Sequence, residues 1–261
     1  MTTAWRFWPD RPAYRIALSS PGPWRGVLGV NAAFERQPFT DTFAPSERLV
    51  ARIGFARWET SFLRWYGAAG IERWRGHRAS GSMTGGVRVT SPASRVDASL
   101  DAATWLGSSS FATVHATGAL RTSAIREGTV LLARGTLGAV SAHSPPDLWL
   151  AGDTGHIRPT LLRAHPLVQN GRLKVDQLGR RLAAVTIEAQ RWIRHGPAVF
   201  APAVFMDVAR IGRRAAGSGR VDTDLGLGVR IGTPGIGGTL RLDVARGLRD
   251  GASAFTLVYE P

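Results

Sequence analysis

The segment DLGLGVRIG at 224–232 alternates large aliphatic residues with glycine or charged residues along its whole length. This period of two is that of a β-strand, whose successive side chains point to opposite faces. The same alternation returns in LRLDV at 240–244 and in FTLVY at 255–259. One face of each strand is therefore apolar and the other is small or charged. That arrangement suits a membrane barrel, which has lipid outside and a polar lumen inside.

Alternation of this kind runs through most of the chain, and tight turns alternate with longer polar loops between the strands. The predicted strands are 14–19, 27–35, 49–58, 62–74, 83–90, 96–105, 112–121, 130–140, 182–193, 199–209, 224–232, 239–247 and 254–260. A short WRFW segment at 5–8 adds one more, or else further strands precede residue 1. We therefore expect an all-β fold, a transmembrane antiparallel up-and-down β-barrel of about 12–16 strands that forms a single domain over 1–261.

Composition narrows the class of protein. No window approaches the roughly 20 apolar residues of a spanning helix, and the absence of cysteine excludes disulfide and thiol chemistry. The net charge is +14, and Lys174 is the only lysine among 33 basic residues. A GC-rich genome that favours arginine accounts for this excess, and so does a cationic lumen that meets lipopolysaccharide phosphates or anionic solutes. The arginines are spread evenly along the chain, so nucleic acid is not an expected partner.

Catalytic and metal-binding motifs are not found. None of the six histidines has a second ligand residue at metal-site spacing. The GSMTG segment at 81–85 lacks the spacing of a nucleophile elbow, and the glycine run at 232–238 lacks the Lys-Ser/Thr of a phosphate loop. We expect no enzyme activity, no cofactor and no metal.

Tryptophans lie near the ends of several predicted strands, as in the aromatic girdles of membrane barrels, although packed core aromatics are the alternative. They are Trp58, Trp65, Trp74, Trp105 and Trp192.

The region from 148 to 260 carries a more specific pattern. A long interruption between strands contains Ile157-Arg158, and the next two strands carry Glu188 and Asp207. A glycine-rich strand, a Leu-x-Leu-Asp strand and an alternating terminal strand follow. In this order the region resembles the BamA/TamA-like outer-membrane assembly barrels of the bacterial surface antigen superfamily. Ile157-Arg158 matches the hydrophobic-Arg core of that family's loop motif, whereas Pro159 and Thr160 replace its glycine and aromatic residue.

The resemblance implies that the loop folds back into the lumen, where we expect Arg158 to pair with Asp207 or Glu188. It also implies that the last strand, with Phe255, Leu257 and Tyr259 on one face, forms a seam that templates incoming strands. The expected location is the bacterial outer membrane, and the expected partners are its lipid, lipopolysaccharide and unfolded outer-membrane or secreted proteins.

Upstream sequence is expected to be missing, because the chain has neither a signal peptide nor the POTRA domains of that family. Residues 1–147 match it only as generic barrel strands. Two alternatives remain open for a membrane barrel: a passive anion-favouring pore, and the membrane anchor of a larger polypeptide such as a patatin-type lipase. A soluble all-β binding protein is the third interpretation.

Overall fold

The structure of the protein is a computed structural model. It describes residues 1–6, 11–40, 43–91, 95–151, 153–154, 161–195, 198–214, 219–232 and 238–260.

The chain forms β-strands and short 3-10 helices. In chain order these elements are β1 (Thr2–Arg6), β2 (Ala13–Pro21), η1 (Pro23–Arg25), β3 (Val27–Gln37), β4 (Ser46–Trp58), β5 (Leu63–Trp74), β6 (Ser80–Thr90), β7 (Val96–Leu106), β8 (Phe111–Arg121), β9 (Gly128–Val140), η3 (Pro146–Leu148), β10 (Leu150–Ala151), β11 (Asp153–Thr154), β12 (Leu162–Pro166), β13 (Val168–Gln169), β14 (Arg172–Leu173), η4 (Val175–Gln177), β15 (Leu178–His195), β16 (Ala198–Arg214), β17 (Arg220–Gly232), β18 (Thr239–Gly247) and β19 (Ser253–Glu260). No helix among the described residues is long and apolar enough to cross a membrane.

Within the described ranges, fourteen strands form one antiparallel meander, in which each strand pairs with its neighbours in sequence from β1 to β9 and from β15 to β19. The long loop between β9 and β15 interrupts this order, and the two strands that it separates pair directly with each other. Each of the thirteen predicted segments overlaps with one strand of the meander, and β1 supplies the fourteenth. The prediction of an all-β up-and-down sheet is confirmed.

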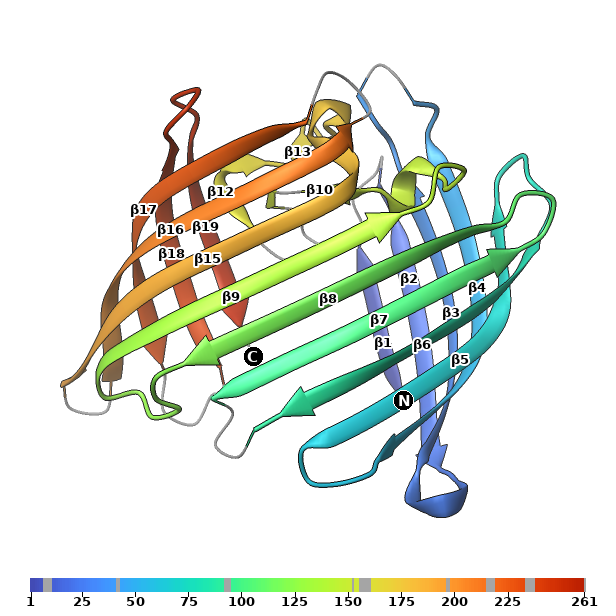
Figure 1. Cartoon of the computed structure of the whole chain (residues 1–261), viewed down its shortest axis with the longest axis horizontal. Helices are drawn as coiled ribbons and strands as arrows, with labels where there is room; N and C mark the ends of the chain where they lie inside the picture. Colours follow the sequence, from blue (N-terminus) through green and yellow to red (C-terminus); the bar gives the residue numbers. More distant parts are fainter. Residues whose placement is uncertain are drawn as a thin grey trace.

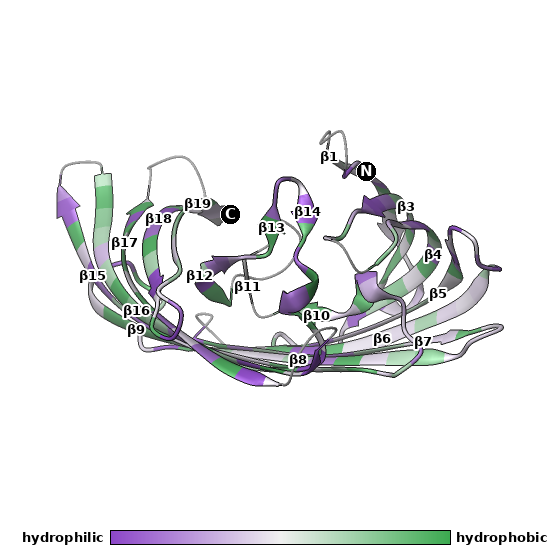
Figure 2. Cartoon of the chain, turned by 90° about the horizontal axis from the view of Figure 1, so that it is seen from above, coloured by the Kyte–Doolittle hydropathy of each residue, from purple (hydrophilic) through white to green (hydrophobic). Residues whose placement is uncertain are grey.

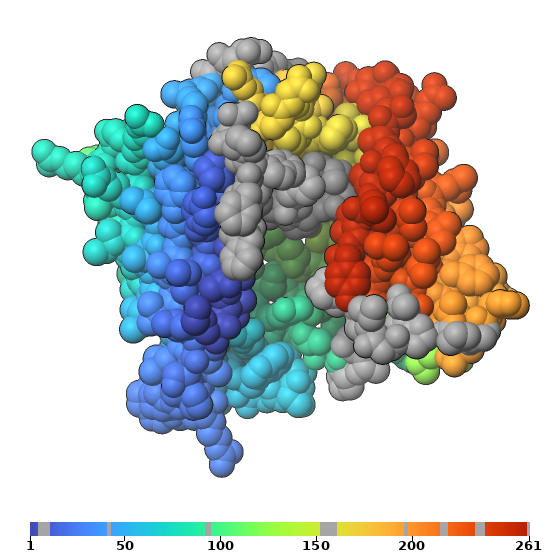
Figure 3. Space-filling view, turned by 180° about the vertical axis from the view of Figure 1, so that it is seen from behind, coloured from blue at the N-terminus to red at the C-terminus, as the bar shows by residue number. Residues whose placement is uncertain are grey.

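The sheet is strongly curved. Figure 1 shows the strands running obliquely across the molecule, and Figure 2 shows that they bend around a concave side. The loop segments β10 to β14 lie within this concavity rather than outside it. Among the described residues β1 pairs only with β2 and β19 only with β18, so both are edge strands. Figure 3 looks between the N-terminal strands (blue) and the C-terminal strands (red), with the loop (yellow) in the upper part.

The distribution of apolar and charged side chains over the two faces of the sheet is the reverse of that in a water-soluble protein. Side chains such as Leu227 and Phe255 are 65% and 63% exposed on the convex face. On the concave face Glu72, Asp207 and Asp224 are 0% exposed. The alternation in the sequence therefore gives an apolar exterior and a charged interior, which does not fit the soluble-protein interpretation.

The tryptophans divide between the two faces. Trp58 and Trp65 are exposed, as the girdle interpretation predicts. That interpretation is wrong for Trp74, Trp105 and Trp192, which are buried on the concave face. The period of two explains the result for the first of these, because Trp74 lies two residues after the buried Glu72 and points to the same side.

Candidate functional site

The loop between β9 and β15 delivers one short strand, β12, to the inner wall. β12 packs against β16, β17, β18 and β19, which are all in the C-terminal half of the meander. Four consecutive side chains of this strand are almost fully buried: Leu162, Arg163, Ala164 and His165. Apolar residues of β15 and β16 surround Leu162, whereas the two polar residues meet charged side chains of the wall. We call the contacts of β12 with the wall the loop clasp.

Arg163 is the centre of the loop clasp. Its guanidinium lies 2.9 Å from a carboxylate oxygen of Glu188 on β15, 3.3 Å from Asp207 on β16 and 3.5 Å from Asp243 on β18. It also stacks on the ring of Phe205, 3.6 Å from the ring centroid. One loop side chain thus contacts three wall strands at once. A planar guanidinium suits this role because it both binds carboxylates and stacks on aromatic faces.

Two arginines of the wall complete the charge network. Arg230 on β17 donates from Nε to Glu188 at 2.8 Å and from Nη1 to Asp243 at 2.5 Å. Arg241 on β18 donates to Asp243 at 3.0 Å. With the loop arginine, three buried guanidinium groups therefore face three buried carboxylates, those of Glu188, Asp207 and Asp243. This matching matters because a buried charge left without its partner costs several kcal/mol.

The next two residues of β12 bind the wall at β17 and at the β18–β19 turn. The backbone N–H of Ala164 donates to Asp224 Oδ2 at 2.7 Å. The His165 ring lies between two carboxylates, with Nδ1 3.0 Å from Asp224 and Nε2 3.0 Å from Asp250. The hydrogen bond to Asp224 is the main cause that raises the pKa of His165 to about 9, so the ring is protonated at neutral pH. Its charge ties the loop to the turn that precedes β19.

A glycine on β17 makes room for the ring beneath Arg163. A Cβ atom at Gly226 would lie 2.2 Å from Cζ of Phe205, which is far inside contact distance. The absence of a side chain at this position therefore allows the Phe205 ring to lie where the guanidinium stacks on it. The glycine-rich strand noted in the sequence thus has a specific packing reason at Gly226.

The predicted loop motif, Ile157 and Arg158, lies outside the described residues, so its role stays a prediction. Its two predicted partners, Glu188 and Asp207, are both on the inner wall, where they meet Arg163. The three predicted seam residues share the exposed face of β19. Their exposures are 63% for Phe255, 58% for Leu257 and 50% for Tyr259.

Arg163 is a site residue that strand parity did not predict, although the sequence carries a signal for it. Leu162-Arg163-Ala164-His165 reads as hydrophobic, arginine, small and ring-bearing. That order fits the family's hydrophobic-Arg-Gly-aromatic motif at least as well as the segment at 157–160, which has a proline in place of the glycine.

A second charged cluster holds the start of the loop against the N-terminal half of the wall. Glu72 on β5 accepts hydrogen bonds from Arg48 and Arg52 of β4. Asp147 in η3 accepts from Trp74 Nε1 at 3.0 Å and lies 3.9 Å from Arg48. Burial raises the pKa of the Asp147 carboxyl, against the opposing effect of Arg48. The loop is thus fixed to both flanks of the sheet, at η3 and at β12.

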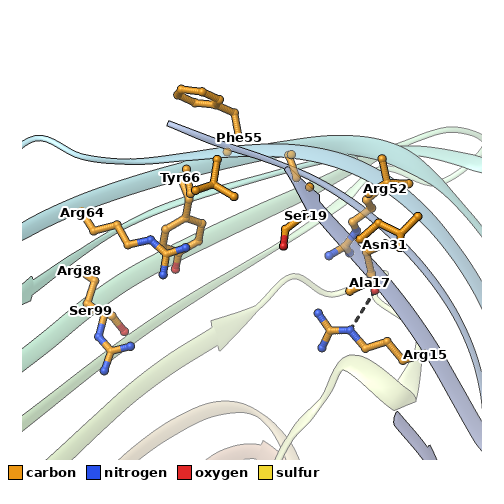
Figure 4. A pocket seen from close by; sticks show the side chains of 18 of the residues that line it. Arg15, Ala17, Ser19, Asn31, Arg52, Phe55, Arg64, Tyr66, Arg88 and Ser99 are labelled. Carbon is orange, nitrogen blue, oxygen red and sulfur yellow. Dashed lines mark hydrogen bonds between the residues drawn. The ribbon is translucent and has the colours of Figure 1, made fainter. Parts of the chain in front are cut away.

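An open groove follows the inner wall along β2 to β8. Its volume is about 690 Å³, and Arg15, Arg52, Arg64 and Arg88 line it. In Figure 4 the guanidinium groups of Arg15, Arg64 and Arg88 lie on one side of the strands, opposite Phe55. Arg15 donates to Asn31 at 2.9 Å, and Arg88 donates to a carboxylate of β7. The lining of this groove is therefore basic. The described residues contain no group of three or more side chains that could hold a metal ion.

Neither a family model nor a curated protein sequence matches this chain. Among solved structures, the crystal structure of BamA from Haemophilus ducreyi lacking POTRA domains 1–3 matches 96% of this chain with a TM-score of 0.71. The fold resembles the BamA barrel. Sequence identity in this match is 12%, and the chain spans 61% of that BamA chain. The resemblance predicted from the sequence is thus confirmed for the fold.

Proposed function

We propose that this chain is an outer-membrane β-barrel that assists the insertion of proteins into the membrane or their translocation across it. Two observations support the membrane location. The convex face is apolar while charged groups are buried on the concave face, and the fold is similar to the BamA barrel. Outer-membrane lipid and lipopolysaccharide are then the surroundings of the convex face, and unfolded outer-membrane or secreted proteins are the substrates. The proposal requires no bond-making chemistry.

The main support for this proposal is the exposed backbone edge of strand β19. Among the described residues its backbone pairs with β18 alone, so its other edge can accept an additional strand. An exposed edge of this kind templates an extended segment through backbone hydrogen bonds. Its outward residues are apolar, which matches the alternation of an incoming barrel strand.

The contacts of the loop clasp hold the strands next to this edge in place. Arg163 connects β15, β16 and β18, and His165 connects β17 to the turn before β19. The last five strands are therefore braced from the inside as one unit, and the edge at β19 is presented from a rigid support. This bracing is the role that the proposal assigns to the inward-folded loop.

Cysteine crosslinking tests the proposal cleanly because the chain has no cysteine of its own. Thr256→Cys on β19 is combined with single cysteines along a terminal strand of a model outer-membrane substrate. Thr117→Cys, on the central strand β8 with a partner on each side, is the matched control. We expect substrate disulfides at position 256 in a register-dependent series and none at 117. Equal crosslinking at both positions, or none at either, would contradict strand templating.

The arginine-lined groove favours one alternative, a passive anion-favouring pore. Planar-bilayer recordings separate the two functions. A steady anion-selective conductance without substrate crosslinking supports the pore, whereas crosslinking with little conductance supports assembly. The role of a membrane anchor for a larger polypeptide, such as a patatin-type lipase, predicts neither result.

A further inference from the structure

An open cavity lies at the β5–β6 connection, at the end of the sheet that is uppermost in Figure 1. Its volume is about 500 Å³, and the described residues that line it are Arg73, Gly76, His77, Arg78 and Ala79. Two arginines and a histidine are therefore in this lining, and no acidic residue is. We call it the rim cavity, and we propose that it binds a phosphate group of a phosphorylated glycolipid, the headgroup chemistry of lipopolysaccharide.

A tight turn brings the basic residues of the rim cavity together. Gly76 has a φ of +79°, a backbone conformation that glycine adopts without strain. The backbone N–H of His77 donates to the carbonyl oxygen of Trp74 at 3.0 Å. The chain thus turns back directly after β5, and it places His77 and Arg78 in one cavity with Arg73 at the end of that strand.

The two arginines of the rim cavity are not neutralised by the described part of the chain. No side-chain hydrogen bond or ion pair joins Arg73 or Arg78 to another described residue. Glu47, on the neighbouring strand β4, lies 2.9 Å from Arg75 and 3.7 Å from Arg36 instead. The one carboxylate of this corner is therefore shared by two other arginines, and the cavity retains an excess of positive charge.

The rim cavity borders the apolar convex face. Arg73 is opposite Leu49 of β4, and Ile71 precedes it by two residues on the same side of β5; both apolar side chains are exposed. Met83 of β6 is also exposed and continues this surface away from the cavity. A phosphate in the cavity thus lies next to a surface that acyl chains can cover. This combination fits a lipid, because a soluble phosphate makes no use of the apolar surface.

The end of the sheet determines which leaflet supplies this lipid. Strands β5 and β9 run in the same direction in the antiparallel meander, so the rim cavity lies at the end from which the long loop starts. The short turn between β4 and β5 is at the opposite end. Short turns face the periplasm in membrane barrels, which places the cavity at the outer, lipopolysaccharide leaflet. This placement rests on the proposed function.

Other arginines of the convex face show the same bias. At the opposite, short-turn end, Arg57 lies 3.3 Å from Glu59, and Arg191 donates to Thr129 at 3.0 Å. At the long-loop end, three further outward arginines have no ion pair with a described residue. They are Arg181, Arg210 and Arg246. Outward arginines without a partner of their own therefore gather at the end that faces the lipopolysaccharide leaflet.

A phosphate fits the rim cavity better than a carboxylate does. One guanidinium fork can saturate the two oxygens of a carboxylate, whereas a phosphate monoester offers three oxygens and up to two negative charges. The guanidinium groups of the cavity come from two different segments, since Arg73 belongs to β5 and Arg78 to the connection after it.

Native mass spectrometry of the full chain in dodecyl maltoside micelles tests the site, with diphosphoryl lipid A as the probe. We expect saturable binding to the unmodified chain. Arg73→Gln and Arg78→Gln should each lose about tenfold in affinity, because each removes one charge-assisted hydrogen bond. Arg191→Gln is the matched control, since it removes an outward arginine at the opposite end of the sheet. Inorganic phosphate is the probe in a second arm, and it should bind more weakly by about tenfold or more.

Gel mobility with and without heating establishes that each variant is folded before binding is measured. Lipid A binding that requires Arg73 and Arg78 but not Arg191 supports the rim cavity. Equal losses in all three variants overturn it, because general surface charge then explains the binding. Equal affinity for inorganic phosphate and lipid A overturns the assignment to a glycolipid.

The failure of this inference is distinguishable from that of the proposed function. A chain that folds into phosphatidylcholine vesicles but does not bind lipid A overturns the rim cavity alone. A chain that does not enter vesicles contradicts the membrane location, and the lipid site with it.

Discussion

Replacing Arg163 with alanine removes one cation from a buried network of three, and the cost should be concentrated on a single carboxylate. Glu188 keeps Arg230 at 2.8 Å, and Asp243 keeps both Arg230 and Arg241. Asp207 is fully buried, and its one ion pair among the described residues is with Arg163. Leaving one buried charge without its partner costs about 3–5 kcal/mol. We expect Arg163→Ala to lower the free energy of unfolding by that amount.

A second substitution tests whether this cost arises from Asp207. The double variant Arg163→Ala/Asp207→Asn removes the orphaned charge, so it should be more stable than Arg163→Ala alone. Urea titration of the detergent-solubilised protein, followed by the mobility shift between folded and unfolded barrel, measures both. Limited proteolysis reports whether the loop is released.

Arg172→Ala is the control for these measurements, since Arg172 is an exposed arginine of the same loop. A double variant no more stable than the single one would show that the lost charge pairing is not the cause. An Arg163→Ala protein with unchanged stability and an equally protected loop would refute the loop clasp itself.

Three further predictions concern separate parts of the molecule. The raised pKa of His165, about 9 against 6.5, means that its stabilisation is complete below pH 6.5 and is lost as the pH rises through 9. The free energy of unfolding, measured by urea titration, should therefore fall by up to about 3 kcal/mol between pH 7 and pH 10. His165→Gln should remove this pH dependence. Leu257→Arg should destabilise the folded barrel by about 2–4 kcal/mol, measured from the folding yield in lipid. Thr256→Arg should have only a small effect on the same yield. Equal effects at the two positions would contradict the assigned faces of β19. Gly226→Ala should displace Phe205 and loosen the loop to protease, and an unchanged digestion pattern would show that the ring has room to move.

Much of the sheet could be predicted from the sequence because its signal is local. A strand needs only alternate apolar and polar residues, so each predicted segment overlapped with a strand without reference to any other part of the chain. The face of each residue follows from the same period. Glu188 and Asp207 could be assigned to the inner wall, and Phe255 and Leu257 to the outer face, from parity alone.

The tryptophans were assigned from their nearness to strand ends and not from the alternation of faces along each strand. Proximity to a strand end suggested an aromatic girdle for all five. Trp74 shares the parity of Glu72 and packs inside against Trp105 and Phe111. Parity was the stronger signal, because the backbone pleat sets the face of the sheet on which a side chain lies. The pleat does not set the depth of a strand end in the membrane.

Tertiary structure alone decided which loop residues reach the wall. A loop has no fixed period, so the sequence spacing between Arg163 and Glu188 does not say that their side chains meet. The position of the Arg163 guanidinium depends on Phe205, Gly226 and the carboxylates of β15, β16 and β18 meeting at one place on the curved wall. Alternation along the chain therefore determined the strands and their two faces. The clasp required the curvature of the sheet, because only that curvature brings distant strands around one loop side chain.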